Sequence, residues 1–75
     1  MLLYQTSYAG YIKKGYNALE KKKYDTAIRH FESAIEKDKK KAEGYIGISD
    51  VYLAKDDFYS AEEVFLEEIE NQKNN

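Results

Sequence analysis

Few residues in this chain could carry out chemistry, and their types do not combine into a catalytic site. The 75 residues include no cysteine and a single histidine, His30. There is therefore no thiolate nucleophile, no second imidazole for a catalytic triad, and too few soft ligands for an ordinary zinc site. No glycine-rich phosphate-binding loop is present either. We predict that the chain is not an enzyme and that it holds no metal and no cofactor.

The paired carboxylates have a simpler explanation than acid–base catalysis. Asp56 and Asp57, followed by Glu62 and Glu63, stand at or near the start of the last apolar stretch. Acidic residues there cap a helix and complement its dipole. His30 follows Arg29 on the side of its stretch that we expect to face solvent.

The charges are divided unevenly along the chain. Residues 1–41 hold ten Lys or Arg against five Asp or Glu, which is +5, and residues 42–75 hold two against nine, which is −7. The split could steer a charged partner or a second copy of the chain, or it could reflect two solvated faces. Nucleic acid is not expected as a partner, because the pI is near 5.4 and a basic face lined with stacking aromatic residues is missing.

Composition and length favour one small helical domain that spans residues 1–75. Proline is absent and glycine occurs four times, which argues against turn-rich β folds. No apolar run reaches the roughly 18–20 residues needed to cross a bilayer, so no membrane partner is expected. Met1–Leu3 is too short to be a signal peptide, and we therefore expect a cytoplasmic location.

The chain repeats itself at a fixed distance. A shift of 34 residues aligns ten identical pairs over 41 overlapping positions. These pairs are Gly10/Gly44, Tyr11/Tyr45, Ile12/Ile46, Leu19/Leu53, Lys21/Lys55, Ala27/Ala61, Phe31/Phe65, Ile35/Ile69, Glu36/Glu70 and Lys39/Lys73. Because most are aromatic, aliphatic or small, they indicate repeated packing rather than low complexity.

Within each unit the apolar residues recur every three to four positions, which is the period of an α-helix. This spacing predicts four helices, near residues 7–22, 25–37, 40–55 and 58–71. The connections between them are short, so we expect neighbouring helices to be antiparallel.

This pattern resembles the tetratricopeptide repeat, a helix–turn–helix unit of 34 residues. The family's aromatic and small residues appear as Tyr11, Gly15, Ala27, Phe31 and Ala34 in the first unit. They appear as Tyr45, Ile48, Ser49, Tyr52, Ala61 and Phe65 in the second unit. The resemblance implies an all-α fold of two stacked antiparallel hairpins, a short right-handed solenoid. Repeat one would span about residues 8–41 and repeat two about residues 42–75.

The resemblance also implies a binding surface, because the first helix of each repeat lines a concave groove in such solenoids. The groove residues would be Ala9, Ile12, Lys13, Tyr16, Glu20, Glu43, Ile46, Gly47 and Asp50. Ile12, Tyr16 and Ile46 would be apolar anchors within a charged rim, and Gly47 would leave an opening between them. Alternatively, Ile12 and Ile46 are half-buried between helices and bind nothing.

Two repeats are fewer than such arrays usually need, since each hairpin leaves an apolar face uncovered. Three explanations remain open: residues 1–6 fold back as an extra turn, the chain is a fragment of a longer array, or copies associate. The leading functional hypothesis is a protein–protein interaction module that binds a peptide or a partner helix in the groove. The alternative is a self-associating structural repeat whose exposed helix faces pack against another copy.

Overall fold

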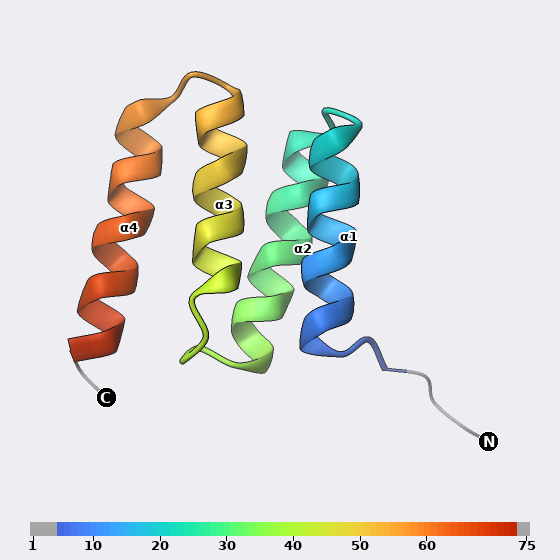
Figure 1. The fold of residues 1–75 in the computed structure, drawn as a ribbon, viewed down its shortest axis with the longest axis horizontal. Coiled ribbons are helices and arrows are strands. Elements are labelled where there is room, and N and C mark those ends of the chain that lie inside the picture. The colour runs from blue at the N-terminus through green and yellow to red at the C-terminus, as the bar shows by residue number, and fades with distance from the viewer. Residues whose placement is uncertain (1–4, 74–75) are drawn as a thin grey trace.

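The computed structural model describes residues 5–73 and contains four α-helices in that part of the chain. They are α1 (Tyr8–Glu20), α2 (Tyr24–Lys37), α3 (Glu43–Ala54) and α4 (Phe58–Lys73), and they run alternately up and down (Figure 1). The predicted all-α fold of antiparallel helical hairpins is confirmed. Leu2, Leu3 and most of the segment suggested as a fold-back turn lie outside the described residues.

The third helix starts later than its predicted start at residue 40. Lys39 and Lys40 lie in a turn, where Asp38 Oδ1 accepts a hydrogen bond of 3.0 Å from the Lys40 amide. The helix begins at Glu43, after Ala42, which has no side-chain oxygen to cap it. An acidic residue thus occupies the first turn of α3, and the lysines are kept away from the positive end of its dipole.

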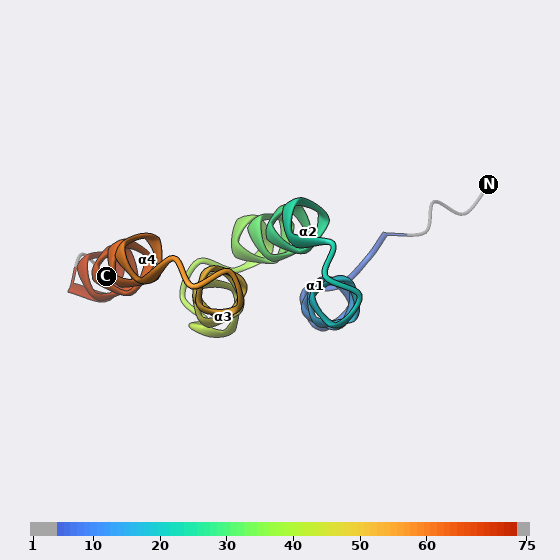
Figure 2. The same cartoon turned by 90° about the horizontal axis from the view of Figure 1, so that it is seen from above.

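The helices form two rows, with α1 and α3 on one side and α2 and α4 on the other (Figure 2). Among the four described helices, α1 contacts α3 whereas α2 and α4 do not contact each other. The row of first helices is therefore the more closely spaced one. A layer of helices bends toward its closely spaced side, which makes the α1/α3 face the inner face of the curve.

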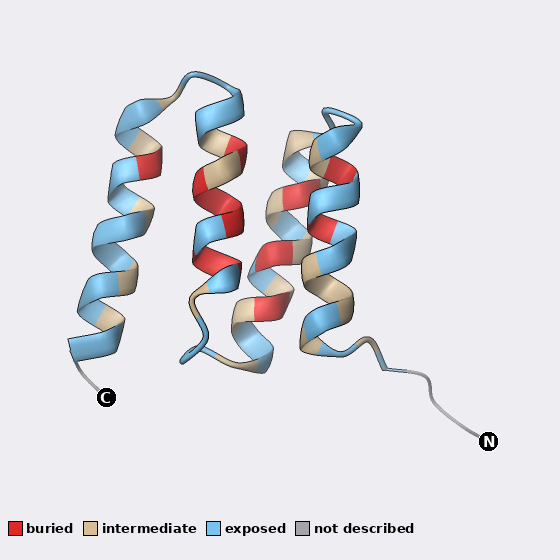
Figure 3. Cartoon of the chain, in the orientation of Figure 1, coloured by how far each residue is buried: buried red, intermediate tan, exposed pale blue. Residues whose placement is uncertain are grey.

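Phe31 of α2 is the centre of the core, and none of its surface is accessible. Figure 3 shows the buried positions concentrated in α1, α2 and α3. Its ring lies between two glycines, Gly15 of α1 and Gly47 of α3. A Cβ atom added to Gly15 would lie 2.5 Å from Phe31 Cε1, and one added to Gly47 would lie 2.3 Å from the same atom. One aromatic ring therefore packs against both the first hairpin and the start of the second.

The two hairpin turns are built alike, although their sequences differ. Lys22 after α1 and Asp56 after α3 both have a φ of 61°, in the left-handed region. In the first turn, the Lys23 amide donates to the Ala18 carbonyl at 2.9 Å and the Lys22 amide donates to the Leu19 carbonyl at 2.9 Å. This hydrogen-bond pattern is the Schellman motif, whose left-handed position is usually occupied by glycine.

Replacing Lys22 by glycine is expected to raise the free energy of unfolding by about 0.5–1 kcal/mol. Glycine adopts a positive φ without the steric cost that a side chain imposes, and the exposed Lys22 side chain contributes little packing. Urea unfolding of Lys22→Gly against the wild type measures the change. A loss of stability would show that the lysine side chain matters more than its backbone conformation.

Tyrosine and amide side chains connect elements that are far apart in sequence. Tyr8 Oη of α1 accepts a hydrogen bond of 3.1 Å from the Gly44 amide, one of the free amides at the start of α3. At the far end of α4, Asn71 and Gln72 donate to the carbonyls of Lys39 and Lys40, at 2.7 and 3.0 Å. The turn between the hairpins is thus held by hydrogen bonds from α4.

Candidate functional site

The centre of the α1/α3 face is a direct contact between two of the sequence-predicted groove residues. Tyr16 Oη donates a hydrogen bond of 2.8 Å to Asp50 Oδ2. The Tyr16 ring also meets the Phe31 ring edge-on, with 5.0 Å between the ring centroids. Tyr16 therefore joins the inner face to the core, and 38% of its surface remains exposed.

The environment of Tyr16 favours its protonated form. Partial burial, followed by the hydrogen bond to the Asp50 carboxylate and its negative charge, raises the pKa of Tyr16 from 10.0 to about 12. Glu43 adds a smaller effect in the same direction. Because the folded state binds this proton more tightly than the unfolded state, its contribution to stability is complete below pH 10 and is lost as the pH rises toward 12.

Tyr16→Phe is therefore expected to reduce the loss of stability between pH 10 and about 12, where Tyr16 titrates in the wild type. At neutral pH the variant should lose about 1 kcal/mol, because the Asp50 carboxylate loses its hydrogen-bond donor. Urea unfolding of the wild type and the variant across this pH range measures the difference. Because all other titrating groups are common to both proteins, the comparison isolates the contribution of Tyr16 to stability. Parallel stability curves for the two proteins would contradict the assignment.

The other predicted groove residues divide into exposed and packed positions. Ala9, Lys13, Glu20, Glu43 and Ile46 are exposed, and Asp50 is half-buried. Ile12 is half-buried and packs against the core, as the alternative interpretation of this residue expected. Ile46 is 39% exposed, so the two equivalent isoleucines differ. The two positions differ because α1 has the next first helix, α3, in contact with it, whereas no further first helix follows α3 among the described residues.

The prediction that Gly47 leaves an opening in the groove is wrong. Gly47 is buried, and the space beside its Cα is filled by the Phe31 ring. Gly47 has no side chain because α2 and α3 approach closely there, which is a packing role. The sequence interpretation placed both Gly47 and Lys13, which occupy equivalent repeat positions, in the groove. Of the two, Gly47 instead packs against the Phe31 ring of α2.

Lys13 lies at the edge of the inner face. It lines a hollow of about 500 Å³ on the outer side of α1, together with Gln5, Thr6, Ser7, Gly10, Lys14 and Asn17. Lys14 and Asn17 also line a neighbouring hollow with His30, Lys21 and Lys23. His30 is half-buried there rather than fully on the surface. Lys13 therefore belongs as much to the outer side of α1 as to the groove.

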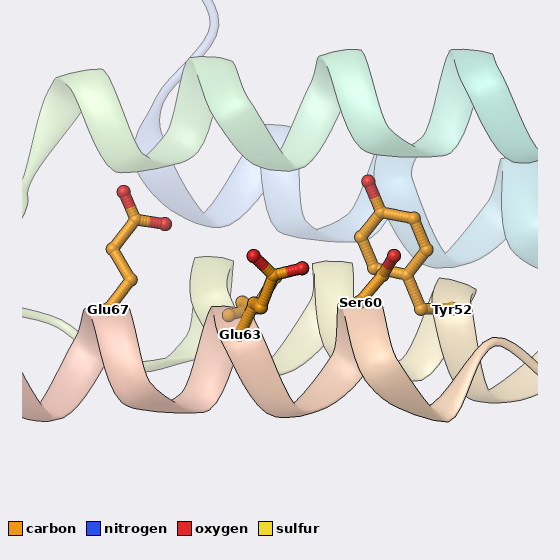
Figure 4. A pocket seen from close by; sticks show the side chains of 5 residues that line it. Tyr52, Ser60, Glu63 and Glu67 are labelled. Atoms are coloured by element: carbon orange, nitrogen blue, oxygen red, sulfur yellow. The ribbon is translucent and has the colours of Figure 1, made fainter.

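Sequence reasoning missed a polar hollow that is lined by residues of α3 and α4. It measures about 350 Å³ and is lined by Tyr52, Ser60, Glu63, Val64 and Glu67. Figure 4 shows Glu63 and Glu67 pointing from α4 toward α2. No spacing signal in the sequence identifies this hollow, because it depends on how α3 and α4 pack together.

Two further features concern the described residues: side-chain groups that could hold a metal ion, and helices that could span a membrane. Within residues 5–73 there is no cluster of three or more His, Cys, Asp or Glu side chains able to hold a metal ion. None of the described helices is both long and apolar enough to cross a membrane. The described surface carries exposed aromatic and aliphatic side chains, among them Tyr16, Phe58 and Ile69.

The fold and its inner face define the class, which is a protein of stacked helical hairpins. Comparison with protein families matches the tetratricopeptide repeat over residues 18–75, and the chain belongs to this family. Its four helices fit two repeats. No curated protein and no solved structure matches the chain. Tetratricopeptide repeats generally mediate protein–protein interactions, bind proteins or peptides, and are typically not enzymes.

Proposed function

We propose that this chain is a protein–protein interaction module that docks an extended peptide or a partner helix along the α1/α3 face. The observation that supports it best is the exposed edge of Tyr16, fixed by its hydrogen bond to Asp50. A rigid aromatic side chain that is already oriented loses little conformational entropy on binding, which is why such residues dominate binding energies.

The charges of this face indicate the chemistry of the partner. The carboxylates of Asp50 and Glu43 lie close enough to Tyr16 to affect its titration, and Glu20 and Lys13 are exposed on the same helix as Tyr16. The partner that fits this arrangement is a peptide segment with one apolar side chain and a flanking Lys or Arg. The apolar side chain would contact Tyr16 and Ile46, and the Lys or Arg would pair with the carboxylates. The carboxylates mainly supply orientation and speed of association, and the apolar contacts supply affinity.

The same face is a poor match for a peptide that ends in a free carboxylate held by side chains. The family members that grip such an end use a lysine and asparagines, and the corresponding positions here are Ile12, Tyr16 and Gly47. None of these side chains donates a cationic or amide hydrogen bond. We therefore propose an internal segment as the ligand.

Selection from a random peptide library on the immobilised protein tests this proposal. The enriched peptides should combine an aromatic or aliphatic residue with a nearby Lys or Arg, and fluorescence anisotropy gives their dissociation constants. Glu43→Lys should weaken binding by about tenfold, the equivalent of about 1.4 kcal/mol. Glu36→Lys makes the same charge change on α2, in the other row, and should leave binding unchanged. Equal effects of the two variants, or no enriched peptides, would overturn the proposal.

A further inference from the structure

The end of the molecule formed by α3 and α4 has a row of uncovered apolar side chains. We call it the C-terminal end face, and its residues are Ile46, Leu53, Phe58, Phe65 and Ile69. Phe58 is 63% exposed and Ile69 is 52% exposed. Ala61 is the one buried residue of α4, and Figure 3 shows most of that helix as exposed. Contiguous apolar surface of this kind usually marks an interaction site.

The first hairpin shows what shape covers such a face. The residues 34 positions earlier are Ile12, Leu19, Tyr24, Phe31 and Ile35. All five belong to the core or pack against it. Phe31 and Ile35 of α2 pack directly against α3, since Cβ atoms added to Gly47 and Gly44 would strike them. A helix placed against α4 as α3 is placed against α2 would cover the C-terminal end face.

The outer side of α1 is the equivalent of the α3 surface that packs on α2. Gly10 corresponds to Gly44, Lys14 to Ile48, and Lys21 to Lys55. In the observed packing, Lys55 Nζ lies 6.0 Å from the centroid of the Tyr24 ring. The same relation between two molecules would place Lys21 of one copy over Phe58 of the other, and Gly10 against Ile69.

The charges of the two surfaces are opposite. α4 carries five glutamates and one lysine. The outer side of α1 and the turn after it carry Lys13, Lys14 and Lys21, and the hollows there have no carboxylate in their lining. Two α4 helices facing each other would bring ten glutamates together, counting five from each copy. The α4-to-α1 arrangement instead joins acidic to basic surface, and it can steer the encounter.

We propose that a second copy of this chain docks on the C-terminal end face through the outer side of its α1, in the register by which α3 packs on α2. The contact is heterologous, so each molecule keeps one free end and further copies can add to form open chains. It is looser than the internal contact, because Lys13 stands where Gly47 admits the Phe31 ring. The lysine stem can lie across Phe65, but it prevents the close approach of the two helices.

The experiment measures mass in solution by light scattering on the full chain, over a range of protein concentrations and at two salt concentrations. The wild type should grow in mass with concentration, and higher salt should reduce the growth. Ile69→Lys on the end face should weaken association by about tenfold. Lys14→Glu combined with Asn17→Glu on the outer side of α1 should do the same. Glu63→Gln, which alters charge as much as Ile69→Lys but points toward α2, should have little effect (Figure 4).

Mixing the two blocked variants gives the sharpest result. The Ile69→Lys protein retains its α1 surface and the Lys14→Glu/Asn17→Glu protein retains its end face, so the mixture should form one-to-one dimers and no longer species. A wild type that stays monomeric, association strengthened by salt, or a mixture that does not associate would overturn the proposal. So would association that Ile69→Lys abolishes but Lys14→Glu/Asn17→Glu leaves unchanged, since that result would indicate α4 against α4. Circular dichroism checks folding, and Phe58→Lys replaces Ile69→Lys if that variant loses helix.

Discussion

Phe31→Ala is expected to lower the free energy of unfolding by about 3–5 kcal/mol, the usual cost of removing a buried aromatic ring. The free energy of unfolding of a domain of this length is roughly 4–11 kcal/mol in total. Much of the Phe31→Ala population should therefore be unfolded in mild denaturant. The cost is at the high end because the ring contacts α1, α2 and α3 at once. Removing it leaves a cavity that the glycines on either side have no side chains to fill.

The matched control for this change is Phe65→Ala, which removes the same side chain 34 residues later. Phe65 is 39% exposed, so its removal should cost about 1 kcal/mol. Urea unfolding followed by circular dichroism gives both values, and dilute samples keep association from contributing. Similar losses for the two variants would mean that Phe31 is not the centre of the core.

Gly47→Ala is expected to destabilise the protein by about 1–3 kcal/mol. Alanine in the middle of a helix is normally more stable than glycine by about 1 kcal/mol, so the expected sign is reversed here. The reversal follows from the 2.3 Å that would separate the new Cβ from Phe31 Cε1. The ring cannot move away, because Gly15 of α1 contacts it on its other side.

Gly10→Ala provides the control for Gly47→Ala. Its new Cβ would meet the Thr6 side chain, which can rotate away, at 2.9 Å. That variant should be unchanged or slightly more stable, by up to about 1 kcal/mol. Combining Gly47→Ala with Phe31→Leu should cost less than the sum of the two single changes, because the smaller side chain makes room. Additive losses would show that the glycine is needed for another reason.

The pattern of residues was sufficient to predict the fold because packing repeats with the sequence. The Ala27 and Ala61 positions, and the Phe31 and Phe65 positions, recur at the 34-residue period. Helix ends were less predictable. α3 begins three residues later than expected because the Asp38 side chain stabilises a turn through the lysines, a local competition that periodicity does not register.

The candidate site was predicted by position but not by contact. Tyr16 and Asp50 were both on the inner face, yet their hydrogen bond depends on how far α1 and α3 are displaced along their axes. Their separation of 34 residues is a usable signal, since equivalent positions of successive repeats lie side by side. The role of Gly47 was predicted wrongly because its position within the repeat does not show which helices are next to it.

The different surroundings of Phe31 and Phe65 mean that the two repeats are not interchangeable modules. Phe31 lies between Gly15 and Gly47, whereas the residue equivalent to Gly15 beside Phe65 is Ser49. A longer array could be built by placing a second copy of residues 42–75 after α4. The Gly47 and Gly44 of that copy would then lie opposite Phe65 and Ile69. A copy of residues 8–41 placed there would bring Lys13 opposite Phe65 instead. Gene duplication or protein engineering that extends the solenoid should therefore succeed more readily with copies of the second repeat, because Gly44 and Gly47 allow close packing on the preceding helix.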